Sequence, residues 1–171
     1  MRQRFDFVED FALKALQNID FLVETRRILP DPIAIVGLSR GAFMAAHLMA
    51  KDDRIRLFLG FAPLTRLETL EEFQGSATIA TANRLNLKHL QDKLSTKTLR
   101  FYIGNRDLRV GTATCFDLVE TLTNNAYDKG LRSPNIEMLI SPSIGHKGHG
   151  SSPQTFQNGI EWLNTKLRHF K

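Results

Sequence analysis

The sequence predicts an α/β fold built on one parallel sheet. Four short runs are continuously apolar and rich in β-branched residues, which is typical of strands buried on both faces. Segments with the apolar spacing of helices separate these runs, and this alternation favours parallel strands joined by right-handed crossovers. We therefore expect a three-layer α/β/α arrangement of about four strands, with helices on both faces of the sheet.

The first elements are a helix and a strand. Over 8–23 the apolar residues recur at steps of three and four, which predicts an amphipathic helix. Pro30-Asp31-Pro32 ends it, because proline has no N–H for the helical ladder and restricts the residue before it. The run Ile33–Val36 is then the first strand, and the segment 40–50, rich in Ala, Met and Leu, predicts the next helix.

The remaining elements repeat this alternation. They are a strand over 55–61, one or two helices over 67–94 with a break near Gly75, a strand over 99–103, a helix over 112–129, a strand over 136–140 and a helix over 153–170. The last helix follows Ser151-Ser152-Pro153, and a serine before a proline suits a helix N-terminus.

Composition indicates one globular domain over 1–171. The net charge is +5, but Lys and Arg are dispersed among acidic residues, which argues against a nucleic-acid surface. No apolar stretch has the length of a signal peptide core or a membrane span. The single cysteine, Cys115, fits a reducing compartment. We therefore expect a cytoplasmic protein with no nucleic-acid and no membrane partner.

The pentapeptide Gly37-Leu38-Ser39-Arg40-Gly41 lies between the first strand and the helix after it. A Gly-x-Ser-x-Gly motif in this place forms a tight turn that lifts the serine hydroxyl clear of the sheet, and its glycines avoid clashes where strand and helix approach. The helix N-terminus favours negative charge, so the backbone N–H of Arg40 is a natural oxyanion donor. The alternative is a phosphate-binding turn without catalysis.

A nucleophilic serine needs a histidine base and a carboxylate that orients it. Asp107 follows the strand 99–103, at the edge where parallel sheets build their sites. The alternative for Asp107 is a turn or helix cap, and we favour the functional interpretation. Arg106 and Arg109 flank it as candidate anion-binding residues or as solvated loop charges.

His146 and His149 are the base candidates, because both follow the last strand. Only one of them can reach Ser39 and Asp107 together. We favour His146 for its shorter reach from the strand end, with His149 as the alternative base. His-x-x-His in a loop without a third ligand argues against a metal site, and we expect no metal and no cofactor.

Smaller features have structural interpretations. The helical pattern makes Cys115 a buried small hydrophobe and places Trp162 on the apolar face of the last helix. The other histidines fall on helical patterns and are expected on the surface: His47, His89 and His169.

With serine, aspartate and histidine after successive strands in that order, the chain resembles the α/β-hydrolase superfamily. Segments 35–41, 102–107 and 145–150 are similar to its prolyl-oligopeptidase and dienelactone-hydrolase-like branch, and the likeness runs over about 6–170. The resemblance implies Ser39 as nucleophile, Asp107 as orienting acid and His146 as base.

The family fold has further strands before the helix that opens this chain, and a loop among them supplies the second oxyanion N–H. The chain therefore resembles an α/β-hydrolase fold truncated at its N-terminus. The strand Ile33–Val36 is then expected to expose an apolar edge. We favour a fragment of a longer chain, and the alternative is a dimer partner or complementing chain that covers this edge.

The leading functional hypothesis is a serine hydrolase that cleaves a small ester or acyl substrate through an acyl-enzyme. A serine peptidase of the prolyl-oligopeptidase type is the second candidate. The third is a catalytically weak or inactive half-domain, because losing one oxyanion donor costs about 10²- to 10³-fold in rate.

Overall fold

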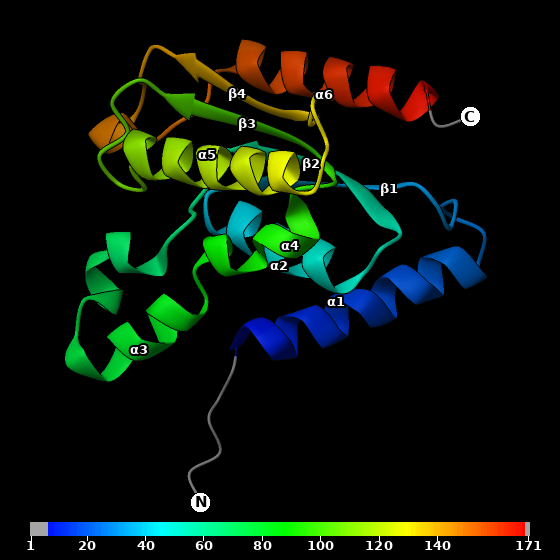
Figure 1. Ribbon diagram of the computed structural model, residues 1–171, viewed down its shortest axis with the longest axis horizontal. Helices are drawn as coiled ribbons and strands as arrows, with labels where there is room; N and C mark the ends of the chain where they lie inside the picture. Colours follow the sequence, from blue (N-terminus) through cyan, green and yellow to red (C-terminus); the bar gives the residue numbers. More distant parts are fainter. Residues whose placement is uncertain (1–6, 170–171) are drawn as a thin grey trace, which may run out of the picture.

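The computed structural model describes residues 7–169 and confirms the predicted α/β architecture. Four parallel strands form one sheet in the order β1-β2-β3-β4 (Figure 1). Their bounds are Ile33–Leu38 for β1, Ile55–Phe61 for β2, Thr98–Gly104 for β3 and Ile136–Ser141 for β4. All four predicted strands are therefore present, and three extend by one or two residues beyond the predicted bounds.

Helices cover both faces of the sheet (Figure 1). On one face lie α1 (Phe7–Glu24), α2 (Arg40–Lys51), α4 (Gln91–Leu94) and α5 (Thr112–Asp128). On the other face lies α6 (Pro153–Arg168), whose N-cap Ser152 accepts the N–H of Thr155 at 3.1 Å as its serine-proline start predicts. The three-layer arrangement follows.

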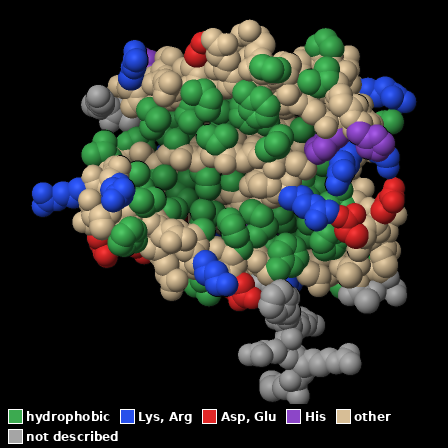
Figure 2. Space-filling model, turned by 180° about the vertical axis from the view of Figure 1, so that it is seen from behind, with side chains coloured by type: hydrophobic (Ala, Val, Ile, Leu, Met, Phe, Trp, Pro, Cys, Tyr) green, Lys and Arg blue, Asp and Glu red, His purple; other side chains and the backbone are tan. Residues whose placement is uncertain are grey.

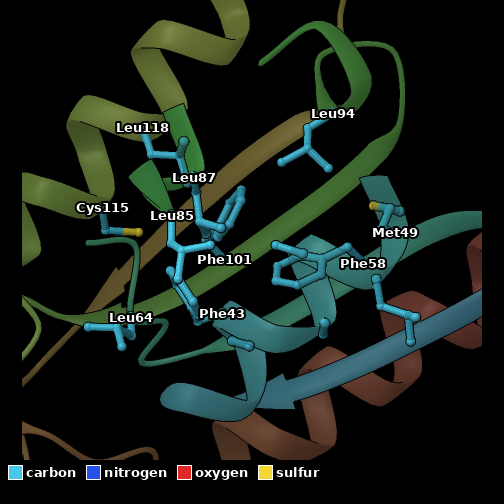
Figure 3. Packing of buried hydrophobic residues seen from close by; sticks show 14 of the residues in the cluster. Phe43, Met49, Phe58, Leu64, Leu85, Leu87, Leu94, Phe101, Cys115 and Leu118 are labelled. Atoms are coloured by element: carbon cyan, nitrogen blue, oxygen red, sulfur yellow. The ribbon is translucent and has the colours of Figure 1, made fainter. Parts of the chain in front are cut away.

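The core has two parts because successive side chains of a strand point to opposite faces. In β3, Phe101 packs into the larger core under α2 and α5, while Tyr102 packs into the smaller one under α6. The ring of Phe101 lies 5.3 Å from that of Phe58 on β2, measured between centroids (Figure 3). Burial on both faces explains why the strands are continuously apolar in sequence. Trp162 is buried against the smaller core, as predicted.

The segment between β2 and β3 is less regular than predicted. In place of one or two helices over 67–94 it contains η1 (Leu67–Thr69), η2 (Glu71–Phe73), α3 (Ser76–Arg84), η3 (Leu87–Leu90) and α4. The break near Gly75 is confirmed, since this glycine is the N-cap of α3. We call residues 64–94 the connecting segment.

His47 of α2 makes a side-chain contact with the connecting segment. Its side chain is buried and its Nε2 lies 3.0 Å from the carbonyl oxygen of Leu85, so the expectation of a surface position is wrong for this histidine. A helical pattern could not show that the segment packs over this face of α2. His89 and His169 are exposed, as predicted.

Asp52, between α2 and β2, is buried and belongs to an ion-pair network. Its carboxylate accepts hydrogen bonds from the backbone N–H of Arg54 (2.9 Å) and from the Arg54 guanidinium (2.6 Å to Oδ2), which also donates to Asp20 on α1 (2.6 Å). The Arg54 hydrogen bonds hold the pKa of Asp52 below its ordinary value against the opposing effect of burial. The network joins the start of β2 to α1.

Replacement of Asp52 by asparagine should lower the free energy of unfolding by about 1–2 kcal/mol near neutral pH, because the Arg54 donors lose a charged acceptor. Folding lowers the pKa of Asp52 from its ordinary value of 3.8, so the ionised carboxylate stabilises the folded chain at pH values above 3.8. This stabilisation is lost as the pH falls below 3.8 and through the lowered pKa of the folded chain. Urea denaturation of both proteins across this pH range measures the difference, which should shrink in acid. Asp53→Asn is the control, since the Asp53 side chain is 89% exposed; an equal loss in that variant would contradict the prediction.

Candidate active site

Ser39 occupies the turn between β1 and α2 with a left-handed backbone conformation, φ 53° and ψ −117°. Such a conformation in a residue other than glycine costs roughly 1–3 kcal/mol and persists where the surroundings fix it. Here the N–H of Ser39 donates to the carbonyl of Phe61 at 2.9 Å, and its own carbonyl accepts the N–H of Leu64 at 3.2 Å. The end of β2 and the start of the connecting segment thus hold the serine turn in place.

The two glycines of the motif differ in importance. A Cβ on Gly37 would lie 2.4 Å from the Cα of Ala42, so only glycine fits where β1 approaches α2. A Cβ on Gly41 would meet nothing within 4 Å, so the expectation that this glycine also prevents a clash is wrong.

Asp107 follows β3, and its side chain is fully buried. Its Oδ1 accepts the backbone N–H groups of Arg109 (2.9 Å) and Val110 (3.0 Å), while its Oδ2 faces His149. The backbone N–H of Asp107 donates to Oγ1 of Thr112 at 3.0 Å. One oxygen of Asp107 therefore caps a turn, as the alternative interpretation expected, and the turn directs the other oxygen toward His149.

His149 joins the serine to the aspartate. Its Nδ1 lies 2.8 Å from Oδ2 of Asp107, and its Nε2 lies 2.9 Å from Oγ of Ser39. A carboxylate can only accept, so Nδ1 carries the proton and Nε2 accepts from the serine hydroxyl. The preference for His146 as base is thereby corrected: His146 is exposed and lies outside this chain of hydrogen bonds.

The loop after β4 explains why the second histidine faces the serine. A 3₁₀ turn over 146–148 directs His146 outward, and positive φ values at Lys147 (55°) and Gly148 (74°) return the chain toward Ser39. A Cβ on Gly148 would lie 2.2 Å from the carbonyl oxygen of Arg106, so this glycine lets the two loops touch. In the sequence, the glycine directly before His149 is the feature that could have indicated this close approach of the two loops.

Arg40 begins α2, where the first N–H groups of a helix have no acceptor within the helix. Its side chain forms an ion pair with Glu72 of η2. The backbone N–H adjoining Ser39 is thus available to a ligand, while the guanidinium contacts the connecting segment.

Two pockets are lined in part by sequence neighbours of these residues: Arg40 in one, and Arg109 and His146 in the other. A polar pocket of about 190 Å³ is lined by Thr69, Leu70, Glu71, Glu72, Leu108, Arg109, His146 and Lys147. An apolar pocket of about 480 Å³ is lined by Phe7, Phe11, Arg40, Phe43, Met44, Leu64, Leu67 and Phe73. The turn η2 separates the two, with Glu72 on the polar side and Phe73 on the apolar side. The Arg40–Glu72 ion pair lies between the pockets.

The described residues contain no group of three or more His, Cys, Asp and Glu side chains that could hold a metal ion. Over 7–169, no helix is both long and apolar enough to cross a membrane.

No protein-family model matches the chain, and no curated protein matches it in sequence. Solved structures do match. A dipeptidyl peptidase IV-like protein from Bacteroides ovatus has a TM-score of 0.71 at 14% identity, over 92% of this chain and 22% of its own. A sugar hydrolase from Lactococcus lactis has a TM-score of 0.72 at 12% identity, over 99% of this chain and 74% of its own.

An acetyl xylan esterase from Paenibacillus sp. R4 has a TM-score of 0.66 at 15% identity, over 91% of this chain and 52% of its own. These neighbours are α/β-hydrolase fold proteins, and the chain has that fold. The chain spans between 22% and 64% of the first three solved structures that it matches.

Cys115, on α5, is fully buried in the larger core (Figure 3). Burial raises the pKa of its thiol to about 12, and the negative charge of Asp107 adds to this rise. The thiol is therefore protonated near neutral pH. This confirms the expectation of a buried cysteine.

Cys115 should resist a disulfide reagent such as Ellman's reagent in the folded chain at about pH 8, well below its raised pKa. The same reagent should modify it fully after unfolding in urea. The absorbance of the released thiolate measures both states, and rapid modification of the folded chain would contradict the assignment.

Proposed function

We propose that this chain is a serine hydrolase that cleaves esters or small acyl substrates through an acyl-enzyme. The observation that carries this proposal is the unbroken chain of hydrogen bonds from Asp107 through His149 to Ser39, with distances of 2.8 and 2.9 Å. A nucleophile, a base and an orienting carboxylate in contact are the minimum that this chemistry requires.

In the proposed reaction each residue has one role. His149 Nε2 takes the proton of the Ser39 hydroxyl as Oγ attacks the acyl carbon, and then donates it to the leaving alcohol. Asp107 Oδ2 holds the ring and stabilises the imidazolium that forms between these steps. In the second half, His149 activates a water molecule that attacks the acyl-enzyme and releases the acid, and Ser39 recovers its proton.

The backbone N–H of Arg40 is the oxyanion donor that we assign among the described residues. One donor stabilises less negative charge than two, and removal of one donor typically costs about 10²- to 10³-fold. We therefore expect slow turnover and a preference for esters over peptides, because an amide has the poorer leaving group. The matched structures include both esterases and peptidases, so the preference rests on the leaving group.

We propose that the apolar pocket binds the acyl group of the substrate, with room for several carbons. Two of its lining residues, Phe43 and Leu64, donate their backbone N–H groups to the carbonyl of Ser39 at 3.3 and 3.2 Å. The pocket wall is thus attached directly to the serine turn. A substrate acyl chain placed there would bury apolar surface beside the Arg40–Glu72 ion pair.

A fluorophosphonate probe should label the folded chain on Ser39, and Ser39→Ala should abolish the labelling. His149→Ala should slow labelling by about 10²- to 10⁴-fold because the serine loses its base. His146→Ala is the matched control and should label at the wild-type rate. Gel fluorescence against time measures all four proteins. Absence of labelling in folded wild-type chain, or an equal loss in the His146 variant, would refute the proposal.

Met44→Trp should reduce the size of the apolar pocket, since Met44 is partly exposed on its wall. We expect kcat/KM for p-nitrophenyl octanoate to fall about tenfold while that for the acetate stays within about twofold. Leu131→Trp, which adds the same bulk after α5, is the control and should leave both unchanged. Equal losses for the two esters would place the acyl chain elsewhere.

A further inference from the structure

The loops that carry Asp107 and His149 lie side by side at the carboxyl end of the sheet (Figure 1). Figure 2, turned by 180°, shows histidine side chains gathered at that end. The path of the loop after β3 determines where the carboxylate of Asp107 points. A side chain outside both loops contacts this path: Thr112, the first residue of α5.

The Thr112 hydroxyl joins the end of β3 to the backbone of Asp107. It donates to the carbonyl oxygen of Gly104, the last residue of β3, at 2.6 Å, and it accepts the N–H of Asp107 at 3.0 Å. A hydroxyl has one proton to donate and lone pairs that accept, so it can make both bonds at once. In a tight turn the carbonyl of the first residue often accepts the N–H of the fourth directly, and here the hydroxyl lies between the two.

These bonds differ from those of an ordinary threonine at the start of a helix. Thr114, two residues further on, donates to the carbonyls of Val110 (2.6 Å) and Gly111 (2.7 Å), so its bonds stay within the first turn of α5. The Thr112 side chain instead contacts Gly104, eight positions earlier in the chain. It therefore fixes the loop relative to the sheet rather than the helix start.

Asp107 is thus held at its backbone and at its side chain. Oδ1 accepts the N–H groups of Arg109 (2.9 Å) and Val110 (3.0 Å), and Oδ2 lies 2.8 Å from Nδ1 of His149. The side chain is fully buried, so water does not compete for these contacts. A displacement of the Asp107 backbone would move Oδ2 away from the His149 ring.

We propose that Thr112 is a positioning residue of the site, whose hydroxyl fixes Asp107 so that Oδ2 faces Nδ1 of His149. This role rests on the proposed hydrolase function, because Thr112 acts through Asp107 and His149 rather than on the substrate. Loss of the hydroxyl removes the partner of the Gly104 carbonyl and of the Asp107 N–H. The loop can then shift, and a misplacement of about 1 Å can cost about 10²-fold in rate.

Valine and serine separate the hydroxyl of Thr112 from the shape of its side chain. Thr112→Val keeps the branched shape and removes both bonds, so fluorophosphonate labelling of Ser39 should slow by about ten- to a hundredfold. Thr112→Ser should stay within about threefold of wild type, because its hydroxyl can make both bonds.

Thr121→Val is the matched control. Thr121 lies on the same helix, and its hydroxyl donates to the carbonyl of Asp117 at 2.7 Å, away from the acid loop. The control removes a hydroxyl bonded to a backbone carbonyl, as the Thr112 variant does, and should label at the wild-type rate.

Proton NMR of the His149 Nδ1–H reports the contact with Asp107 without any reaction. The signal should exchange slowly with solvent in wild type and in Thr112→Ser, and faster in Thr112→Val, because its hydrogen bond is weakened. His149→Ala identifies the signal by its absence. A folded wild-type chain that shows this signal but is not labelled would refute the proposed function, and the signal of the Thr112 variants would then decide the positioning role alone.

Circular dichroism checks that each variant folds, and Thr112→Ala replaces the valine variant if that one unfolds. The proposal is overturned if removal of the hydroxyl changes neither labelling nor the NMR signal, if Thr121→Val loses as much, or if serine fails to restore both. Unfolding of both the valine and the alanine variant would also overturn it, since the hydroxyl would then serve the stability of the whole fold.

Discussion

Parallel pairing of β1, β2, β3 and β4 is the constraint on which the site depends. It brings the carboxyl ends of all four strands to one edge, so the segments that follow them meet there although they are far apart in sequence. Ser39 and His149 are separated by 110 positions and still lie in contact. The same edge fixes the serine turn, because the end of β2 supplies the acceptor for its N–H and the start of the connecting segment supplies a donor for its carbonyl.

The strands, the serine turn and the aspartate could be predicted from sequence because each depends on local patterns. β-branched apolar runs determine strands buried on both faces, and the order of elements determines the edge at which Ser39 and Asp107 lie. The choice between His146 and His149 depends on the path of a loop, and the positive φ values of Gly145, Lys147 and Gly148 turn that loop so that His149, not His146, faces Ser39. Distance along the chain was therefore a poor guide to distance in space.

The connecting segment shows a second limit of sequence patterns. Apolar residues over 67–94 fit a helical spacing, but the segment packs on α2 and the serine turn rather than on a flat sheet face, and short 3₁₀ turns follow that surface. Burial of His47 beneath it is a tertiary contact that no local window contains. The Gly-x-Ser-x-Gly motif predicted that both of its glycines prevent clashes. A Cβ at Gly37 would clash severely with Ala42, whereas a Cβ at Gly41 would meet no atom within 4 Å.

The strand at one edge of the described sheet is also the strand that carries the nucleophile that we propose. Ser39 directly follows Leu38, the last residue of β1, so whatever stabilises that strand also orders the serine turn. Among the described residues β1 pairs with β2 alone, so the position of the hydroxyl depends on that one pairing.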